Sequence, residues 1–401
     1  MTQQCNLACR YCLAEAGPDK PHLNPQLAFA AVEAAFKVPT DRPLTIQLSG
    51  GEPFVNFPLV KVLVDYIEDK QRETGRSIVL CTQSNGALID DEIAEFLGDH
   101  RISIGISCDG PSRFSDVSRP TLRGQASLQR TLKGMEALRR HNVPFGVIVV
   151  LSRANIADLE GLLSFFAELG VRSLKINPVN RIGDAQMTWD TLSITPDQYF
   201  DFIDSFVACL MQGRMSFSES NLAEYLKYLT RRRRDYRCMR SNCGAGQSFF
   251  VVDAAGDVYP CAHSAGIHAW RLGTITDAAG DLVSLGTRSE IVQHFPQRLV
   301  DQMEETRSCP WRHFCEGGCA VNAQQRFGTI HAPDTLCAFY ERLYPRLLER
   351  LAAEPHRFQT LLDVTLGQGR ASVVEFSLSQ HGERVPSNDH FMREALRHAR
   401  S

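Results

Sequence analysis

The chain has 401 residues, of which 43% are hydrophobic and 22% are charged, and its formal net charge is −3. This composition is ordinary for a globular protein long enough for more than one domain. The small net charge gives no global attraction to nucleic acid or to a membrane surface. No apolar run reaches the roughly 20 residues that span a bilayer, and no signal-peptide pattern precedes Cys5. We therefore expect a cytoplasmic protein that binds neither nucleic acid nor membrane.

Apolar strands alternate with amphipathic helices between about residues 25 and 178. Strands are predicted over 44–50, 77–84, 102–110, 144–152 and 173–179, and helices over 27–36, 59–70, 90–98, 127–141 and 156–170. This alternation is typical of a parallel sheet that is buried on both faces. Right-handed crossovers curl such units into a complete or partial barrel, with functional groups at the carboxyl ends of the strands.

The remaining sequence changes in character twice. Helical patterns over 196–215 and 221–237 are followed by a loop-rich, cysteine-rich stretch and then by a helical pattern over 338–354, which Pro345 is expected to interrupt. We therefore predict four segments, namely a barrel over 1–190, a helical insert over 191–236, a cysteine-rich module over 237–345 and a tail over 346–401. The tail shows little periodicity beyond 371–380 and receives no assignment.

Thirteen cysteines are present, and most of them are clustered. Disulfides are a poor explanation in a reducing cytosol, whereas short spacings are typical of metal ligands or catalytic thiols. Three cysteines stand apart in apolar segments and are interpreted as small buried hydrophobic residues: Cys81, Cys108 and Cys209. The others fall into three groups, Cys5, Cys9 and Cys12; Cys238, Cys243 and Cys261; and Cys309, Cys315, Cys319 and Cys337.

The first group forms a C-x3-C-x2-C loop that lacks a fourth cysteine. Three thiolates can bind three irons of a cubane and leave the fourth iron open to an exchangeable ligand, as in catalytic zinc sites. Cys5, Cys9 and Cys12, with Tyr11 before the last, resemble the signature of radical S-adenosylmethionine (SAM) enzymes. The resemblance implies a 4Fe–4S cluster that cleaves SAM to a 5′-deoxyadenosyl radical. The alternative is a zinc site that a ligand elsewhere completes.

Further segments of this resemblance lie at the ends of predicted strands. Gly50, Gly51 and Glu52 resemble the motif that binds the amino group of SAM, which suits close backbone approach and carboxylate–ammonium pairing. Asn85, Ser107 and Asp109 resemble positions that contact the ribose and the carboxylate of SAM. Arg119 is expected to contact the SAM carboxylate or the substrate. For Asp109 a role as a turn residue is an equal alternative.

One departure from the superfamily pattern concerns the first strand. A strand of several residues precedes the cysteine loop in the superfamily, whereas only residues 1–4 precede it here. If the chain begins at Met1 in the native protein, we expect a barrel without its first strand; a start assigned too late or a truncated chain is the alternative.

The second and third cysteine groups resemble the SPASM extension of peptide-modifying radical SAM enzymes. The resemblance implies two auxiliary clusters, the first on Cys238, Cys243, Cys261 and Cys319. The second would use Cys309, Cys315 and Cys337, with Thr306 where the family pattern has a cysteine. Asp301, Glu304, Glu305, a water or the substrate would then fill the vacancy, unless this cluster is absent. A structural zinc ribbon is the alternative for the module. The fold class implied is α/β, a partial (β/α)6 radical SAM barrel followed by a SPASM iron–sulfur domain.

The function implied is modification of a ribosomally made precursor peptide, with installation of a thioether, carbon–carbon or ether crosslink. The nearest alternative is the anaerobic sulfatase-maturating branch, which makes formylglycine and carries an Asp after the cysteine equivalent to Cys261. Ala262 and His263 stand there instead, and His263 is either a base or a structural residue. A non-catalytic zinc or iron–sulfur scaffold is the alternative of another class.

The expected partners are the precursor peptide, an external electron donor and a separate leader-binding protein. The basic run at residues 231–234 is either a site for an acidic leader peptide or a solvated helix end.

Overall fold

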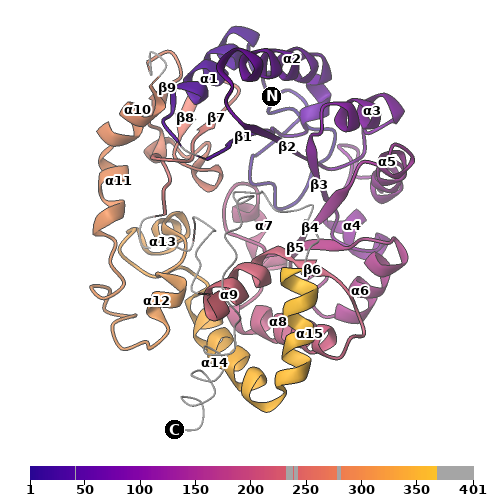
Figure 1. The fold of residues 1–401 in the computed structure, drawn as a ribbon, viewed down its shortest axis with the longest axis vertical. Coiled ribbons are helices and arrows are strands. Elements are labelled where there is room, and N and C mark those ends of the chain that lie inside the picture. The colour runs from indigo at the N-terminus through magenta and orange to yellow at the C-terminus, as the bar shows by residue number, and fades with distance from the viewer. Residues whose placement is uncertain (41, 232–237, 239–242, 278–280, 368–401) are drawn as a thin grey trace. The chain divides into compact units, whose positions relative to one another are not determined.

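The computed structural model describes residues 1–40, 42–231, 238, 243–277 and 281–367 (Figure 1). Its main sheet has six strands in the order β1-β2-β3-β4-β5-β6. The strands are β1 (Leu44–Leu48), β2 (Ile78–Ser84), β3 (Ser103–Ser107), β4 (Phe145–Leu151), β5 (Ser173–Pro178) and β6 (Ser218–Glu219). The pairings of β1 with β2, β2 with β3, β3 with β4, and β5 with β6 are parallel. The predicted α/β class with a parallel sheet is therefore confirmed.

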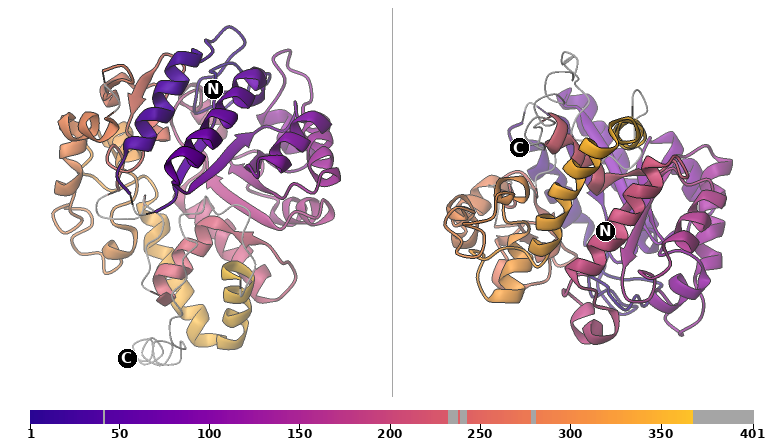
Figure 2. Two further views of the ribbon diagram at one scale, coloured as in Figure 1. Left: turned by 45° about the horizontal axis from the view of Figure 1, so that its top comes forward. Right: turned by 90° about the horizontal axis from the view of Figure 1, so that it is seen from below.

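Helices follow the strands as the alternation predicts. They are α1 (Pro25–Lys37), α2 (Phe57–Thr74), α3 (Asp91–Asp99), α5 (Leu128–Arg140) and α6 (Leu159–Glu168), with the shorter α4 (Ser112–Ser118) and α7 (Ala185–Leu192). Their apolar faces are buried, and the strands carry long buried runs, as in β4. Figure 2 shows the helices of this part wrapped around the strands.

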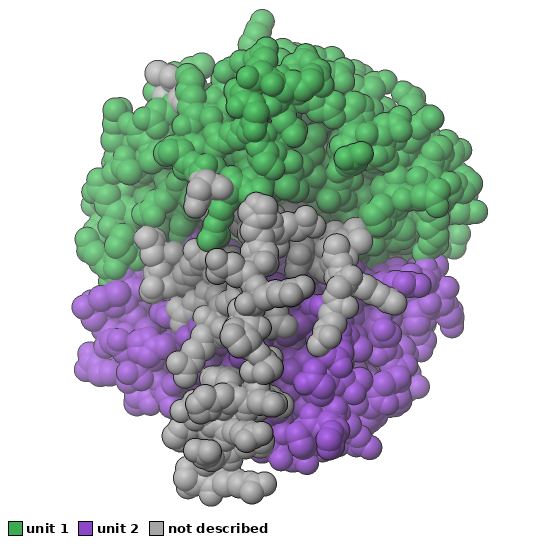
Figure 3. Space-filling view, in the orientation of Figure 1, with its two compact units in different colours: residues 1–148, 180–192, 244–297 green, residues 149–179, 193–243, 298–401 purple. Residues whose placement is uncertain are grey.

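The chain divides into two compact units (Figure 3). The first comprises residues 1–148, 180–192 and 244–297, and the second comprises 149–179, 193–243 and 298–401. The boundary falls within β4. The four segments predicted from the sequence remain a prediction.

Within the first unit, the cysteine-rich sequence forms a small antiparallel sheet of β7 (Val251–Val252), β8 (Asp257–Tyr259) and β9 (Gly273–Thr274). Val258, Ile275 and Leu282 form a core cluster, with Leu27 of α1 packed against it. The helices after it are α10 (Leu282–Arg288) and α11 (Glu290–Gln293), and short 3-10 turns lie over Ala262–Ser264, His268–Trp270 and Phe295–Gln297.

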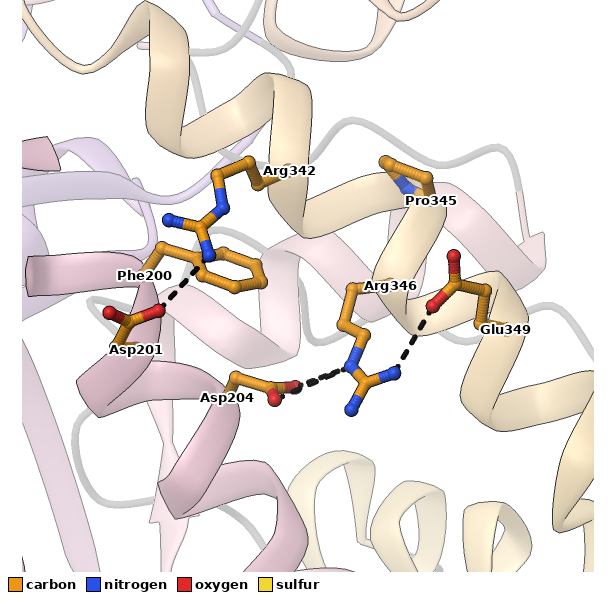
Figure 4. Close-up of a pocket in the computed structure, with 7 residues that line it drawn as sticks. All are labelled: Phe200, Asp201, Asp204, Arg342, Pro345, Arg346 and Glu349. Carbon is orange, nitrogen blue, oxygen red and sulfur yellow. Dashed lines mark hydrogen bonds and ion pairs between the residues drawn. The ribbon is translucent and has the colours of Figure 1, made fainter. Parts of the chain in front are cut away.

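The second unit is mostly helical outside its strands. Its helices are α8 (Pro196–Met211), α9 (Ser220–Arg231), α12 (Arg312–Cys315), α13 (Ala320–Phe327), α14 (Cys337–Ala353) and α15 (Pro355–Leu366). An ion-pair ladder joins α8 to α14 (Figure 4). Arg342 contacts Asp201 at 3.1 Å and covers the ring of Phe200 at 3.9 Å, and Arg346 contacts Asp204 at 3.2 Å.

One expectation about the elements was wrong, and two elements were not predicted. Pro345 lies inside α14, which continues through it to Ala353. α14 packs against α8 and α15, and this tertiary packing compensates for the backbone hydrogen bond that the proline removes. α15 occupies sequence left without assignment, and the two-residue strand β6 lies in the predicted helical insert. Residues 371–380 lie outside the described part of the chain.

Candidate functional site

The cysteine loop is anchored through its backbone to three later segments of the first unit. The Cys5 N–H donates to the Gly17 carbonyl at 3.3 Å, and the Arg10 N–H donates to the Ser118 carbonyl at 2.9 Å. The Cys12 carbonyl accepts the Asp184 N–H at 3.0 Å. These bonds fix the loop beside the segments that follow β3 and precede α7.

The three thiols of this loop lie close enough to influence one another. Burial raises the pKa of Cys9 to about 12, with smaller contributions from Cys12 and Cys5. Burial also raises the pKa of Cys5, whose Sγ accepts the Leu7 N–H at 3.4 Å. The Cys12 Sγ accepts the Ala16 N–H at 3.5 Å. N–H groups aimed at sulfur are the hydrogen bonds that stabilise thiolates bound to iron–sulfur clusters. The residues present therefore fit a cluster held by three cysteines.

The glycine pair after β1 holds the segment that leads into this loop. The Gly51 N–H donates to the Thr2 carbonyl and the Glu52 N–H donates to the Gln4 carbonyl, each at 2.8 Å. A Cβ on Gly50 would lie 2.2 Å from the Thr2 oxygen, and one on Gly51 would lie 2.4 Å from the Gln4 oxygen. Only glycine permits this approach. Thr2 thus makes a parallel bridge to Gly50, although the sheet itself begins at β1.

Glu52 is fully buried, and its carboxylate accepts three internal hydrogen bonds. The donors are the backbone N–H of Phe54 at 3.3 Å, the Ser84 hydroxyl at 2.9 Å and the backbone N–H of Asn85 at 2.8 Å. Burial nevertheless raises the pKa of Glu52 to about 7. The carboxylate therefore joins the ends of β1 and β2, and the predicted contact with SAM remains a prediction.

Asn85 links the end of β2 to the cysteine loop. Its Nδ2 donates to Asn6 Oδ1 at 2.8 Å and lies 3.8 Å from Cys5 Sγ. Ser107, at the end of β3, is buried and accepts a hydrogen bond from Gln83 Nε2 at 3.2 Å. The structure thus places Asn85 directly at the loop.

The half-buried side chain of Tyr11 meets two buried side chains, those of Asp109 and Arg119, close to Cys9. The Tyr11 hydroxyl donates to Asp109 and accepts a hydrogen bond from Arg119 Nη1 at 2.9 Å. Arg119 is 9% exposed, and its positive charge opposes the rise in the Cys9 pKa. Asp109 is fully buried, so its role exceeds that of a surface turn residue. The sequence analysis treated Tyr11 only as part of a motif and missed this network. Asp109 and Arg119 lie 98 and 108 residues after Tyr11, so no local pattern links them.

A second set of three thiols gathers in the second unit. Burial raises the pKa of Cys315 to about 12, and Cys337 and Cys309 raise it further. Thr306, at the position where a cysteine was expected, is 1% exposed and donates its hydroxyl hydrogen to the Val300 carbonyl at 2.7 Å. The Asp301 carboxylate is engaged by Arg312 Nε at 2.5 Å. Cys309 and Cys337 thus lie close enough to Cys315 to influence its charge, and their role as cluster ligands remains a prediction.

The other predicted cluster ligands are divided between the units. Cys238, Cys243 and Cys319 belong to the second unit, whereas Cys261 belongs to the first and begins the turn that contains His263. Their grouping remains a prediction. Most of the basic run at residues 231–234 lies outside the described residues.

Lys175 on β5 is a polar residue that the sequence analysis missed. Burial lowers its pKa, while Cys238 and the buried carboxylate of Glu219 act in the opposite direction. Glu219 accepts the Ile176 N–H at 2.9 Å and thereby joins β6 to β5. A lysine inside an otherwise apolar strand was the signal that pointed to it.

The N-terminal part of the sequence also matches a known protein family. The model of the radical SAM superfamily matches residues 1–166. An uncharacterized protein of Methanocaldococcus jannaschii is 31% identical over 278 residues, which cover 69% of this chain and 87% of that protein. The chain belongs to the radical SAM superfamily.

Further similarities concern maturation enzymes. A cysteine-type anaerobic sulfatase-maturating enzyme of Clostridium perfringens is 22% identical over 359 residues, covering 86% of this radical SAM chain and 94% of the relative. The solved structure "Native anSMEcpe with bound AdoMet and Kp18Cys peptide" has a TM-score of 0.75 and 20% identity, covering 87% and 95% of the two chains. Streptococcus suis SuiB bound to its precursor peptide SuiA has a TM-score of 0.62 and 15% identity, covering 84% and 74%.

These findings confirm the predicted family, the SPASM-type fold and the enzyme class. The protein is a radical SAM enzyme, and its cofactors are a 4Fe–4S cluster and SAM. No helix among the described residues is long and apolar enough to cross a membrane.

Cys5, Cys9 and Cys12 would hold the SAM-binding cluster, which supplies the electron for SAM cleavage when bound. The chain's own residues supply its setting. Asn85 orients the loop near Cys5, and the Tyr11, Asp109 and Arg119 network fixes it near Cys9. The buried guanidinium of Arg119 also offsets negative charge beside Cys9.

Proposed function

We propose that this radical SAM enzyme abstracts a hydrogen atom from a ribosomally made peptide and installs a thioether, carbon–carbon or ether crosslink in it. The observation that carries the proposal is the pair of three-cysteine sites, one beside the ends of β1 to β3 and one formed by Cys309, Cys315 and Cys337. The first would bind the cluster that cleaves SAM. The second would bind an auxiliary cluster that accepts the electron left after bond formation.

Two similar structures hold peptides, namely the Kp18Cys peptide and SuiA. This supports a peptide substrate. Gly50, Gly51, Glu52, Asn85, Ser107, Asp109 and Arg119 are the residues that we propose for SAM binding. The 13 cysteines, which form no disulfide in the structure, and the need for reduced thiols support a cytosolic location, and the reaction requires an external electron donor.

A second candidate is formylglycine formation, which the names of the sulfatase-maturating relatives favour. The residue after Cys261 argues against formylglycine formation, because Ala262 cannot act as the base that an Asp provides at this position in the sulfatase-maturating family. His263 is the nearest residue with a suitable side chain.

The test uses anaerobically reconstituted protein with SAM, dithionite and either a peptide encoded beside the gene or a cysteine-containing sulfatase peptide. We expect release of 5′-deoxyadenosine. In the encoded peptide we also expect the loss of two hydrogen atoms as a new bond forms between two residues. Loss of the cysteine sulfur from the sulfatase peptide would instead establish formylglycine formation. A Cys9→Ala variant is the control and should release no 5′-deoxyadenosine. Protein that holds zinc and no iron would overturn both candidates.

A further inference from the structure

Arg298 is the most completely bonded buried cation among the described residues. Its side chain is 4% exposed, and all five of its N–H groups donate to backbone carbonyls. The Nε donates to Ile330 at 2.6 Å, and Nη2 donates to Gly317 at 2.7 Å and Ala332 at 3.0 Å. The Nη1 donates to Glu316 and Gly318, each at 3.1 Å. One guanidinium thus holds two separate loops.

The first of these loops has an unusual backbone. Glu316, Gly317 and Gly318 have φ values of 51°, 72° and 66°, which place three successive residues in the left-handed region. This conformation turns their carbonyls toward the guanidinium. It is unfavourable for Glu316, so the bonds from Arg298 are needed to hold it.

The same loop is anchored from its other side by Asp334. The Asp334 N–H donates to the Gly317 carbonyl at 2.8 Å, and its Oδ2 accepts the Cys319 N–H at 2.9 Å. A Cβ on Gly318 would lie 2.4 Å from the Asp334 Cβ. The short segment between Cys315 and Cys319 is therefore fixed from two sides.

This segment connects the two predicted auxiliary sites. Cys315 belongs to the three-thiol site with Cys309 and Cys337, and Cys319 is a predicted ligand of the other cluster. The carbonyls that surround Arg298 carry no net charge, so its positive charge acts on the nearest anionic groups. Cys319, Asp334, Cys243 and Cys315 are those groups, and they partly oppose the lowering of the Arg298 pKa by burial.

We propose that Arg298 is the positioning residue of the auxiliary-cluster module: it fixes the spacing of Cys315 and Cys319, and its buried charge raises the reduction potential of the clusters bound there. A cluster gains negative charge on reduction, so a nearby fixed cation stabilises the reduced form. The inference rests on the proposal that these cysteines bind auxiliary clusters. The sequence analysis gave Arg298 no role.

The experiment removes the SAM-binding cluster by replacing Cys5, Cys9 and Cys12 with alanine in the full chain. Only auxiliary clusters then remain, and no SAM chemistry contributes to the readout. Iron content, melting temperature and EPR-monitored redox titrations are measured for this background alone and with Arg298→Met or Arg298→Lys. Arg346→Met is the matched control, because it removes an arginine from the exposed ladder on α14.

We expect Arg298→Met to lower the iron content at least twofold and to lower the equilibrium constant for reduction of the remaining cluster about tenfold, or about 59 mV for one electron. Arg298→Lys keeps the charge without the planar fork, so it should lose iron while the remaining cluster keeps its potential. Arg346→Met should match the background.

Several outcomes overturn the inference. Unchanged iron content and potential in Arg298→Met would do so. If Arg298→Met does not fold, Arg298→Lys is the variant that tests the inference. An iron content and a melting temperature equal to those of the background would show that the planar guanidinium is not needed. A background that binds no iron would instead refute the auxiliary clusters of the proposed function, and the inference would fall with them.

Discussion

The carboxylate of Glu52 accepts three hydrogen bonds, yet burial raises its pKa so far that the group takes up a proton near neutral pH. Its side chain has no exposed surface, and its pKa is raised to about 7. In the unfolded chain the pKa of Glu52 would be near the ordinary glutamate value of 4.5. The folded protein therefore binds the proton more tightly than the unfolded chain, so protonation of Glu52 stabilises the fold at low pH.

The first prediction follows from the raised pKa of Glu52. The stabilisation is fully present below pH 4.5 and is lost as the pH rises through about 7, an effect of about 3 kcal/mol. Urea unfolding of the cluster-free protein at pH 5 and pH 8 measures it. The wild type should lose stability relative to Glu52→Gln over this interval, whereas the exposed control Glu160→Gln should follow the wild type. Parallel pH profiles for wild type and Glu52→Gln would contradict the assignment.

At the scale of residues, sequence spacing predicted the thiols and the strand-end positions that meet them. Asn85 and Arg119 lie at the cysteine loop, as their places after predicted strands indicated. The role of Arg298 was not predictable, because its partners are backbone carbonyls 18 to 34 residues away. Every residue has such a carbonyl, so the residue types do not indicate which ones are bound.

At the scale of elements, the N-terminal segment and the turn after β1 behave as one piece. The backbone of Thr2 and Gln4 lies against Gly50 and Gly51 so closely that a methyl group has no room. This contact determines where Cys5 lies, although it involves no cysteine.

We therefore predict that Gly51→Ala displaces the segment leading to Cys5. The new Cβ would lie 2.4 Å from the Gln4 oxygen, and relief of such an overlap costs about 1–3 kcal/mol. The melting temperature and the iron bound by the Cys5–Cys12 loop should both fall. Gly17→Ala is the matched control in the same region, because a Cβ there would meet only the Lys20 side chain at 3.8 Å. Equal iron content in the two variants would refute the prediction.

The strands of the barrel were predictable because each one is long, apolar and followed by an amphipathic helix. β6 was missed because two residues carry no periodic signal. The signal for α15 was present, since Phe358, Leu361, Leu362 and Thr365 follow helical spacing and are buried. Pro345 misled the analysis, because local propensity favours a break and tertiary packing against α8 overrides it.

At the scale of the whole molecule, regular structure is unevenly distributed. The barrel strands are five to seven residues long, apart from β6, whereas β7, β8 and β9 have two or three residues each. Between Arg298 and Cys337 the helices are no longer than eight residues. Such a module needs cross-links to be rigid, and thiolate–iron bonds between distant cysteines are suitable ones.

Removal of iron should therefore loosen this module before the barrel. We expect chelation of the anaerobically loaded enzyme to increase hydrogen exchange over residues 298–337 severalfold, with little change in α2. Mass spectrometry of the loaded and chelated protein measures the difference. Equal exchange over 298–337 in the two samples would show that the module is rigid without iron.

The anchoring of the cysteine loop also constrains when during synthesis it can be completed. Its thiols are synthesised before the anchors, because the Cys12 carbonyl accepts the Asp184 N–H and the Arg10 carbonyl accepts the Thr188 hydroxyl, which lies 178 residues later than Arg10. Iron and sulfide delivered to a nascent chain would meet a loop that lacks these two anchors. The loop can therefore reach its final backbone geometry only after the chain has been made at least as far as Thr188.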